Sequence, residues 1–371
     1  MKFRIILTMS TLLMVIIFLL GCNNNANNLS KSVFDIKEGK DDQIKILLYY
    51  DMEGLSGQNI LTSIDFPRPE YFEARELLTA DINAVIEGLF EGGVDSVFVV
   101  DAHGSFNPEP DVLLDKMDKR AKMLFKKERF HPYVDLLEEN NYDAIVAVGM
   151  HSKTGGGGFA EHTVNLGTDW ILNGMSINES ELLAYSWGRI GVPLIFVSGD
   201  DKLYEQLRWM DWIEYVITKN AKGIADAELF PIEQVHSEMR LAAKRSIENL
   251  ISAKYTKLTE PITARLRVES PADLSILTRV PGLSYENNSV TFHAPNFIEA
   301  YNGMRGLLDV AQSGYYNIAA ELYLSQSGDS FMNFKEAVFQ SWQETVNNRD
   351  IEPEETTEQR TNEEQLYFGS R

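Results

Sequence analysis

The sequence contains little cysteine and comparatively few basic residues. Cys22 is its only cysteine, so no disulfide can form within the chain, and stability must come from a packed core or from bound metal. The 371 residues are enough for about two domains. There are 34 lysines and arginines against 55 aspartates and glutamates, which gives a formal net charge of -21. A chain this acidic repels phosphate backbones, so we expect no nucleic-acid partner.

Long apolar runs are also scarce, with one exception near the N-terminus. Lys2 and Arg4 precede an apolar stretch over 5–20, which leads into the letters LLGC, ending at Cys22. This pattern predicts a secretory signal over 1–21, and its end resembles the lipobox of bacterial lipoproteins, in which the cysteine is lipidated. An uncleaved anchor is the alternative, although about 16 apolar residues are short for a bilayer span. Both interpretations predict a protein of the cell envelope, anchored to a membrane outside the cytoplasm.

Strand-like and helix-like segments alternate after a polar stretch over 22–42, which has the composition of a flexible tether. The stretch over 71–90 has apolar residues at helical spacing. The other segments are strands expected over 44–50, 96–100, 144–148 and 193–197, and a short helix over 133–139. This alternation predicts an α/β catalytic domain over 43–201, with a parallel sheet covered by helices on both faces.

The pattern changes in the second half of the chain. Asn173-Gly174, the strongest short hairpin signal, interrupts the alternation. A long helix, two strands and a further helix then predict a smaller α+β domain over 202–312. A helical C-terminal extension is expected over 313–348. The acidic tail over 349–371 has few apolar residues and is expected to be disordered.

Three of the apolar runs end in residue types that bind metals. Asp51 and Glu53 follow the first, Asp101 and His103 the second, and His151 the third. In a parallel sheet the carboxyl ends of the strands meet at one edge, where open α/β sheets place their sites. Imidazole together with carboxylate suits zinc, and also manganese or cobalt, better than magnesium or calcium. The sequence therefore predicts a transition-metal site at this edge.

A glycine run follows the third of these strands. Gly155 to Gly158 match neither a P-loop nor the spaced glycines of dinucleotide sites, but they let the backbone approach a ligand closely. His162, at the end of the run, is a candidate acid, base or oxyanion donor. A flexible surface loop is the alternative interpretation.

Glu179, at the start of the helix after the hairpin, is a further candidate ligand. A helix N-terminus favours an acidic side chain in any case, and Glu161 and Glu181 compete with Glu179 for this role on composition. The remaining histidines lack comparable acidic neighbours, and we expect them to be structural: His131, His236 and His293.

In this order and spacing the motifs resemble the D-aminopeptidase family of dinuclear zinc peptidases, peptidase family M55. The motifs are DMEGLSG at 51–57, DAH at 101–103, GMH at 149–151, EHT at 161–163, NG at 173–174 with Glu179, and SGDD at 198–201. The resemblance covers roughly 44–310. The segment beyond about Gly314 has no counterpart in it.

The resemblance implies a ligand set for two zinc ions: Asp51 as the bridge, Glu53 and His151 completing one site, and His103 and Glu179 completing the other. It also implies that His162 is the catalytic histidine. The family's ring-shaped oligomers imply a homo-oligomer, and the expected ring is a decamer.

These observations predict a di-zinc aminopeptidase that hydrolyses short peptides with an N-terminal D-amino acid. The expected envelope location makes peptides derived from the bacterial wall candidate substrates. Two alternatives remain open. A zinc amidase acting on γ-D-glutamyl wall peptides would need the same ligands in a differently shaped pocket. A lipoprotein that binds a peptide or metal without catalysis would leave His162 without a role.

Overall fold

The computed structural model describes residues 43–125, 131–135, 142–279, 284–324 and 330–349. The expected signal (1–21), the tether (22–42) and all of the acidic tail after Arg349 lie outside these ranges. So does most of the helix expected over 133–139, and its described residues, 133–135, form a turn instead. Within the described ranges, no helix has both the length and the apolar character needed to cross a bilayer.

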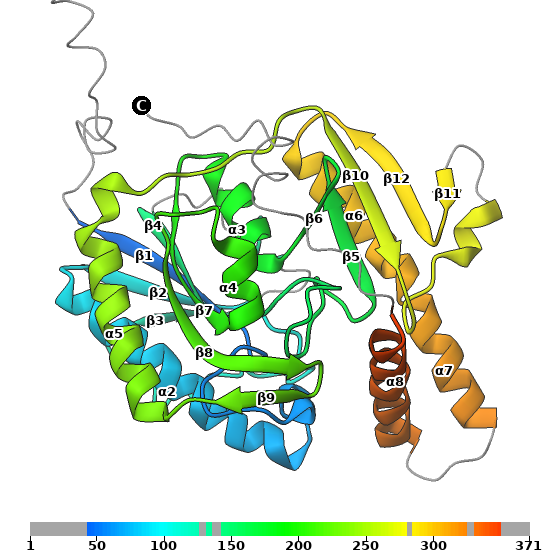
Figure 1. Cartoon of the computed structure of the whole chain (residues 1–371), viewed down its shortest axis with the longest axis horizontal. Coiled ribbons are helices and arrows are strands. Elements are labelled where there is room, and N and C mark those ends of the chain that lie inside the picture. The colour runs from blue at the N-terminus through cyan, green and yellow to red at the C-terminus, as the bar shows by residue number, and fades with distance from the viewer. Residues whose placement is uncertain (1–42, 126–130, 136–141, 280–283, 325–329, 350–371) are drawn as a thin grey trace, which may run out of the picture. The chain divides into compact units, whose positions relative to one another are not determined.

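The larger sheet has seven strands in the order β3-β2-β1-β4-β7-β8-β9 (Figure 1). All neighbours pair in parallel except β9, which forms an antiparallel hairpin with β8. The strands are β1 (Lys45–Tyr50), β2 (Ser96–Asp101), β3 (Lys122–Leu124), β4 (Ala144–Met150), β7 (Leu194–Asp200), β8 (Glu214–Gly223) and β9 (Asp226–Leu229). The predicted α/β fold with a parallel sheet is confirmed.

Helices cover both faces of this sheet (Figure 1). The helices are α2 (Pro69–Glu91) and α5 (Ile232–Glu248) on one face, and α3 (Glu179–Gly188) and α4 (Asp201–Leu207) on the other. Side chains of β1 alternate between the two layers, so that Ile46 and Leu48 pack with α2 and α5 while Leu47 and Tyr49 pack with α3. A strand buried on both faces has no polar side, which explains its continuous apolar sequence.

The second sheet has five antiparallel strands in the order β11-β12-β10-β5-β6. They are β5 (Thr168–Leu172), β6 (Met175–Ile177), β10 (Ile262–Val268), β11 (Ser284–Glu286) and β12 (Ser289–Ala294), with α6 (Phe297–Ala311) packed on β10 and β12. Asn173 and Gly174 form the hairpin turn with φ angles of 52° and 90°, as the Asn-Gly signal predicts.

The two sheets do not divide at Asp201, where the pattern of the sequence changes. The β5–β6 hairpin precedes that residue but belongs to the second sheet, whereas β8, β9 and α5 follow it and belong to the first. The chain continues the parallel sheet after α4 because β8 pairs directly with β7.

The described residues of the C-terminal extension are helical. It consists of α7 (Ser313–Leu324) and α8 (Ser330–Asn347), which pack on each other. Trp342 of α8 is fully buried. Three short 3-10 helices complete the described structure: η2 (Leu61–Ile64), η3 (Leu250–Ser252) and η4 (Ser275–Arg279).

Candidate metal centre

The strand-end residues meet at one edge of the larger sheet. Asp51 and Glu53 follow β1, His103 follows β2, and His151 follows β4, and these three strands are neighbours. Glu179 begins α3, directly after the β5–β6 hairpin. His162 completes the cluster, and all six side chains are buried. The structure thus brings together the six residues that the resemblance assigns to metal binding or catalysis.

Two glycines allow the loops after β1 and β4 to touch. The backbone N–H of Gly54 donates to the carbonyl of Gly149 over 2.8 Å. A Cβ atom on Gly149 would lie 2.3 Å from the carbonyl oxygen of Asp51, and Gly149 has a φ of 74°, which L side chains rarely adopt. Glycine at position 149 is therefore required for Asp51 and His151 to lie side by side.

Asp51 occupies the centre of the cluster. Its Oδ1 lies 2.7 Å from Nδ1 of His103, and its Oδ2 lies 3.6 Å from Nε2 of His151. Glu53 lies beside the first histidine, with Oε2 3.5 Å from Nδ1 of His103. Glu179 lies beside the second, with Oε1 3.4 Å from Nε2 of His151. Asp51 thus lies between two pairs, each made of a histidine and a glutamate. This position suits a carboxylate that bridges two ions.

Ligand atoms of the six residues form three groups in which all atoms lie within 4.8 Å of one another. The groups are Asp51-Glu53-His103, Asp51-His151-Glu179 and Glu53-His151-His162. The resemblance implies that Glu53 and His151 hold the same ion, and these two residues do occur together in the third group. It also implies that His103 and Glu179 hold the other ion, but none of the three groups contains both of them. The division of ligands between two ions stays a prediction.

Backbone carbonyls fix the proton positions of the three imidazoles. A carbonyl only accepts, so the ring nitrogen that contacts it carries the proton and the other nitrogen presents its lone pair. The contacts are His103 Nε2 to Ile64 O at 2.7 Å, His151 Nδ1 to Ser152 O at 3.0 Å, and His162 Nδ1 to Ala160 O at 2.8 Å. In the neutral rings, the lone pairs therefore face the carboxylates.

This arrangement fits a transition metal. Nε2 of His151 is buried and has no hydrogen-bond partner among the described residues. Three buried carboxylates surround it and its neighbour His103. Buried negative charge must be balanced by protons or by a cation. Nitrogen and carboxylate oxygen ligands together are those of zinc, manganese or cobalt.

The electrostatics of the cluster favour carboxylates in their charged form. Burial raises the pKa of Asp51, but the hydrogen bond from His103 and the nearby ring of His151 outweigh burial and hold that pKa well below its usual range. Burial lowers the pKa of His103, but Glu53 and Asp51 outweigh it and raise that pKa well above the ordinary value. The cluster thus attracts positive charge, either protons or, in their place, metal ions.

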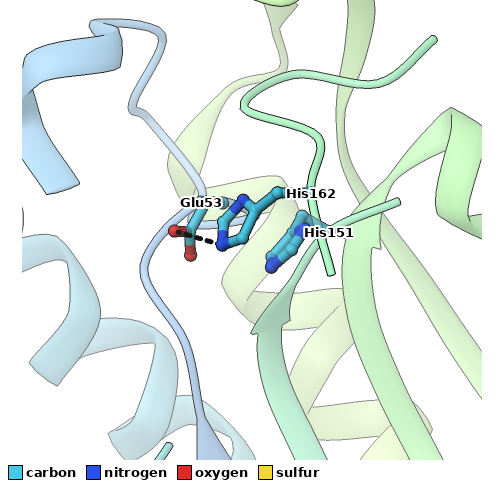
Figure 2. A group of neighbouring side chains, drawn as sticks. All are labelled: Glu53, His151 and His162. Atoms are coloured by element: carbon cyan, nitrogen blue, oxygen red, sulfur yellow. Dashed lines mark ion pairs between the residues drawn. The ribbon is translucent and has the colours of Figure 1, made fainter. Parts of the chain in front are cut away.

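His162 differs from the other two histidines in its electrostatics. Burial and the neighbouring His151 lower its pKa, so its ring is neutral near pH 7. The two rings stack with centroids 4.2 Å apart and planes at 20°, and Nε2 of His162 lies 3.9 Å from Oε1 of Glu53 (Figure 2). A neutral imidazole with a free lone pair can accept a proton.

The competing acids have other partners. Glu161 accepts hydrogen bonds from the backbone of Gly155, over 3.0 Å, and of Gly157, and it pairs with Arg349. Glu181 completes the N-terminal capping box of α3 and accepts from the indole of Trp209 over 3.0 Å. Neither belongs to a metal group, and Glu161 explains the glycine run, which wraps around its carboxylate.

The remaining histidines lie outside the metal groups of the described residues. His236 pairs with Asp81 over 2.8 Å, and Nδ1 of His293 lies 3.0 Å from the hydroxyl of Thr263. The ring of His131 packs edge-on against Tyr301.

Three residues of the centre carried no recognisable signal in the sequence. Tyr133 donates its hydroxyl proton to Glu179. Lys219 of β8 is fully buried, and burial lowers its pKa to about 7. Its ammonium donates to the carbonyl of Glu53 over 2.8 Å and to Gln58. Trp342 of α8 stands almost perpendicular to the ring of His162, with centroids 6.2 Å apart. All three reach the site through packing between distant segments.

Comparisons with known proteins agree with this geometry. Residues 44–306 match the model of a peptidase family, M55, described as D-aminopeptidase. A D-aminopeptidase of Bacillus subtilis (strain 168) is 24% identical over 274 residues, which cover 72% of this chain and 98% of that protein. The solved structure of the Zn-dependent D-aminopeptidase DppA from Bacillus subtilis, described as a self-compartmentalizing protease, has a similar fold. Its TM-score is 0.65 at 20% identity, covering 72% of this chain and 98% of that one.

Proposed function

Because the chain belongs to the D-aminopeptidase family, peptidase family M55, we propose that it is a metal-dependent aminopeptidase acting on short peptides with an N-terminal D-amino acid. One observation supports this most strongly. Three carboxylates and three imidazoles converge at one sheet edge, and the Nε2 atom of His151 has no hydrogen-bond partner there among the described residues. The names of the relatives, a D-aminopeptidase and a Zn-dependent D-aminopeptidase, support the substrate class and the metal.

Five side chains would hold two zinc ions, with manganese or cobalt as alternatives: Asp51 as the bridge, with Glu53, His103, His151 and Glu179. Bound there, the ions would act as Lewis acids on the scissile carbonyl and on the attacking water. The chain contributes the orientation of the ligands. The carbonyls of Ile64 and Ser152 hold the two ligand imidazoles with their lone pairs inward, and Tyr133 orients Glu179.

His162 would move the proton. Its Nδ1 is held by the carbonyl of Ala160, so its Nε2 lone pair faces Glu53. The neutral ring takes a proton from the attacking water and gives it to the leaving amine. Stacking on His151 fixes the ring plane.

The location and the assembly are parts of the same proposal. We propose that Cys22 carries a lipid and anchors the enzyme to a membrane on the outer side, where wall-derived peptides are available. The relative described as self-compartmentalizing supports a homo-oligomer, and the family resemblance suggests a decameric ring. Labelling with a radioactive fatty acid tests the lipid, with Cys22→Ser as the control. Light scattering of the detergent-solubilised protein tests the assembly.

A substrate panel tests the activity. The purified full-length protein would be analysed for bound metal and then assayed with D-Ala-D-Ala, L-Ala-L-Ala and a γ-D-glutamyl dipeptide, with and without a chelator. Hydrolysis of D-Ala-D-Ala that the chelator abolishes and zinc restores is the expected result. Hydrolysis of the γ-D-glutamyl peptide alone would instead identify an amidase. Absence of both metal and hydrolysis would favour a binding protein.

A further inference from the structure

The C-terminal helices lie outside the family match, yet they contribute to the cavity over the metal centre. The match ends at residue 306, before α7 and α8 begin. The cavity has a volume of about 330 Å³ and reaches from the metal cluster to side chains of both helices. These side chains, called the C-terminal wall below, are Tyr315, Tyr316, Phe334, Val338 and Phe339. This chain therefore completes its pocket with a segment that the family model does not include.

Contacts with the site loops hold the C-terminal wall in place. Lys335 of α8 pairs with Asp65 and donates to the carbonyl of Phe66. Beyond the other end of α8, Arg349 pairs with Glu161 and Glu269. The hydroxyl of Tyr315 donates to the carbonyl of Leu166 over 2.7 Å. Segments on both sides of His162 are thus bound to the extension.

The loops around the metal cluster also contribute apolar side chains to the cavity. Ile64 and Leu166 line it, together with Phe106, which is 79% exposed and has a φ of 68°. A positive φ is uncommon for a bulky residue, and such residues are often found at functional sites. The ammonium of Lys335 lies 5.1 Å from the centre of the Phe106 ring. Aromatic and aliphatic groups from both the site loops and the C-terminal wall thus line the cavity next to the metal cluster.

Charged groups in this part of the cavity are already paired. Apart from the metal cluster, the charged side chains that line it among the described residues are Asp65 and Lys335, which bind each other. An acidic or basic substrate side chain would lose its hydration without gaining an ionic partner. An apolar side chain would lose only unfavourable contact with water.

We propose that the C-terminal wall forms a side-chain subsite that selects peptides with a bulky apolar residue next to the scissile bond. This inference rests on the proposed peptidase function. Burial of a side chain as large as leucine or phenylalanine favours binding by about 10- to 100-fold over one that gains no such contact. The preferred substrates are therefore short peptides with an aromatic or large aliphatic residue at one of the two positions flanking the cleaved bond.

Two matched peptide series test the selectivity. In one, D-Phe, D-Leu, D-Ala or D-Asp precedes glycine, and in the other the same residues follow D-Ala. The expected result for the full-length enzyme is a kcat/KM about 10-fold or more higher for Phe and Leu than for Ala and Asp, at one position at least. Equal kcat/KM values across both series would overturn the proposal.

Tyr316→Ala separates the C-terminal wall from other causes of selectivity. Tyr316 is 69% exposed, so its replacement removes little core packing. The variant should lose about 3-fold or more of the preference for Phe over Ala. Tyr204→Ala is the control, because Tyr204 is a partly exposed tyrosine of α4 that does not line the cavity, and its selectivity should equal the wild type. Unchanged selectivity in Tyr316→Ala would contradict the proposal.

A binding measurement distinguishes failure of this inference from failure of the peptidase function. If no peptide is hydrolysed, the proposed function is wrong, and calorimetry with dipeptides whose scissile carbonyl is replaced by a methylene still reads out the subsite. About 10-fold tighter binding of the D-Phe form than of the D-Asp form, reduced in Tyr316→Ala, would support the C-terminal wall as a subsite. Equal affinity, or no binding of either form, would overturn it.

Discussion

The ammonium of Lys219 donates a hydrogen bond to the backbone carbonyl of Glu53 over 2.8 Å, although the two residues are 166 positions apart. It also donates to the backbone and side-chain oxygens of Gln58, at 2.6 and 3.0 Å. A lysine of β8 therefore holds the loop that carries two expected metal ligands, Asp51 and Glu53.

Lys219→Met tests this support. Methionine fills a similar volume but leaves buried carbonyl oxygens without a donor, so the free energy of unfolding should fall by about 3 kcal/mol. Zinc affinity should fall as well, because the Glu53 loop loses its anchor. Lys222→Met is the control, since Lys222 lies on the same strand but forms an exposed pair with Glu228, and it should change stability by less than about 0.5 kcal/mol. Denaturant unfolding and zinc titration measure both effects.

Asp51→Asn should remove most of the bound metal, because Asp51 lies beside both His103 and His151 and is the expected bridge. His103→Ala should lower the zinc content only to about half, since it removes a ligand of one ion in a two-ion site. Metal analysis after dialysis checks both variants. Equal zinc loss in the two would contradict the bridging role.

His162→Ala should lower kcat by about 100- to 10,000-fold while the zinc content stays at the wild-type level. The reason is that Nε2 of His162 serves the proton transfer and is not needed to hold an ion. His162 does share a group with Glu53 and His151, so the opposite result has a clear meaning: loss of zinc along with activity would make His162 a ligand.

Gly149→Ala should destabilise the fold by about 2 kcal/mol or more, because its Cβ would collide with the carbonyl of Asp51 in addition to the strain of a positive φ. Gly93→Ala isolates the collision. Gly93 also has a positive φ, 98°, but its Cβ would meet nothing within 4 Å, so it should cost about 1 kcal/mol from strain alone. Thermal and denaturant unfolding compare the two variants, and equal losses would rule out the collision.

His236 makes stability depend on pH. Its hydrogen bond with Asp81 raises its pKa above the ordinary 6.5. A raised pKa in the folded state means that the stabilisation is complete below pH 6.5 and disappears as pH rises through the folded value. His236→Gln should therefore reduce the free energy of unfolding by about 1 kcal/mol near pH 5.5 and by much less near pH 9. His293→Gln, which loses only an exposed contact with Thr263, should reduce it equally little at both pH values.

Periodicity and strand ends were sufficient to predict the elements that carry the metal centre. The apolar run before Asp51 has no polar face because β1 is buried on both sides, and parallel order then puts Asp51, His103 and His151 at one edge. The glycine run after His151 predicted a close approach to a ligand. Its N–H groups instead bind Glu161.

Other parts of the fold left no such pattern. β8 reads EYVITKNAKG, and its mixture of charged and apolar residues does not resemble the continuous runs of β1 or β4. Its place in the first sheet depends on pairing with β7. The contact between Trp342 and His162 joins residues 180 positions apart (342 − 162), and only the packing of α8 determines it.

The β5–β6 hairpin, between His162 and Glu179, belongs to the second sheet, whereas β8 and β9, which follow Asp201, belong to the first. If the chain were produced as two halves divided at Asp201, β5 would therefore lose its pairing with β10, and β7 would lose its pairing with β8. Each half would present two long strand edges with unpaired N–H and C=O groups, which are templates for aggregation. The centre can be studied only in one continuous chain, and any hybrid enzyme with a relative should exchange the hairpin together with β10, β11 and β12.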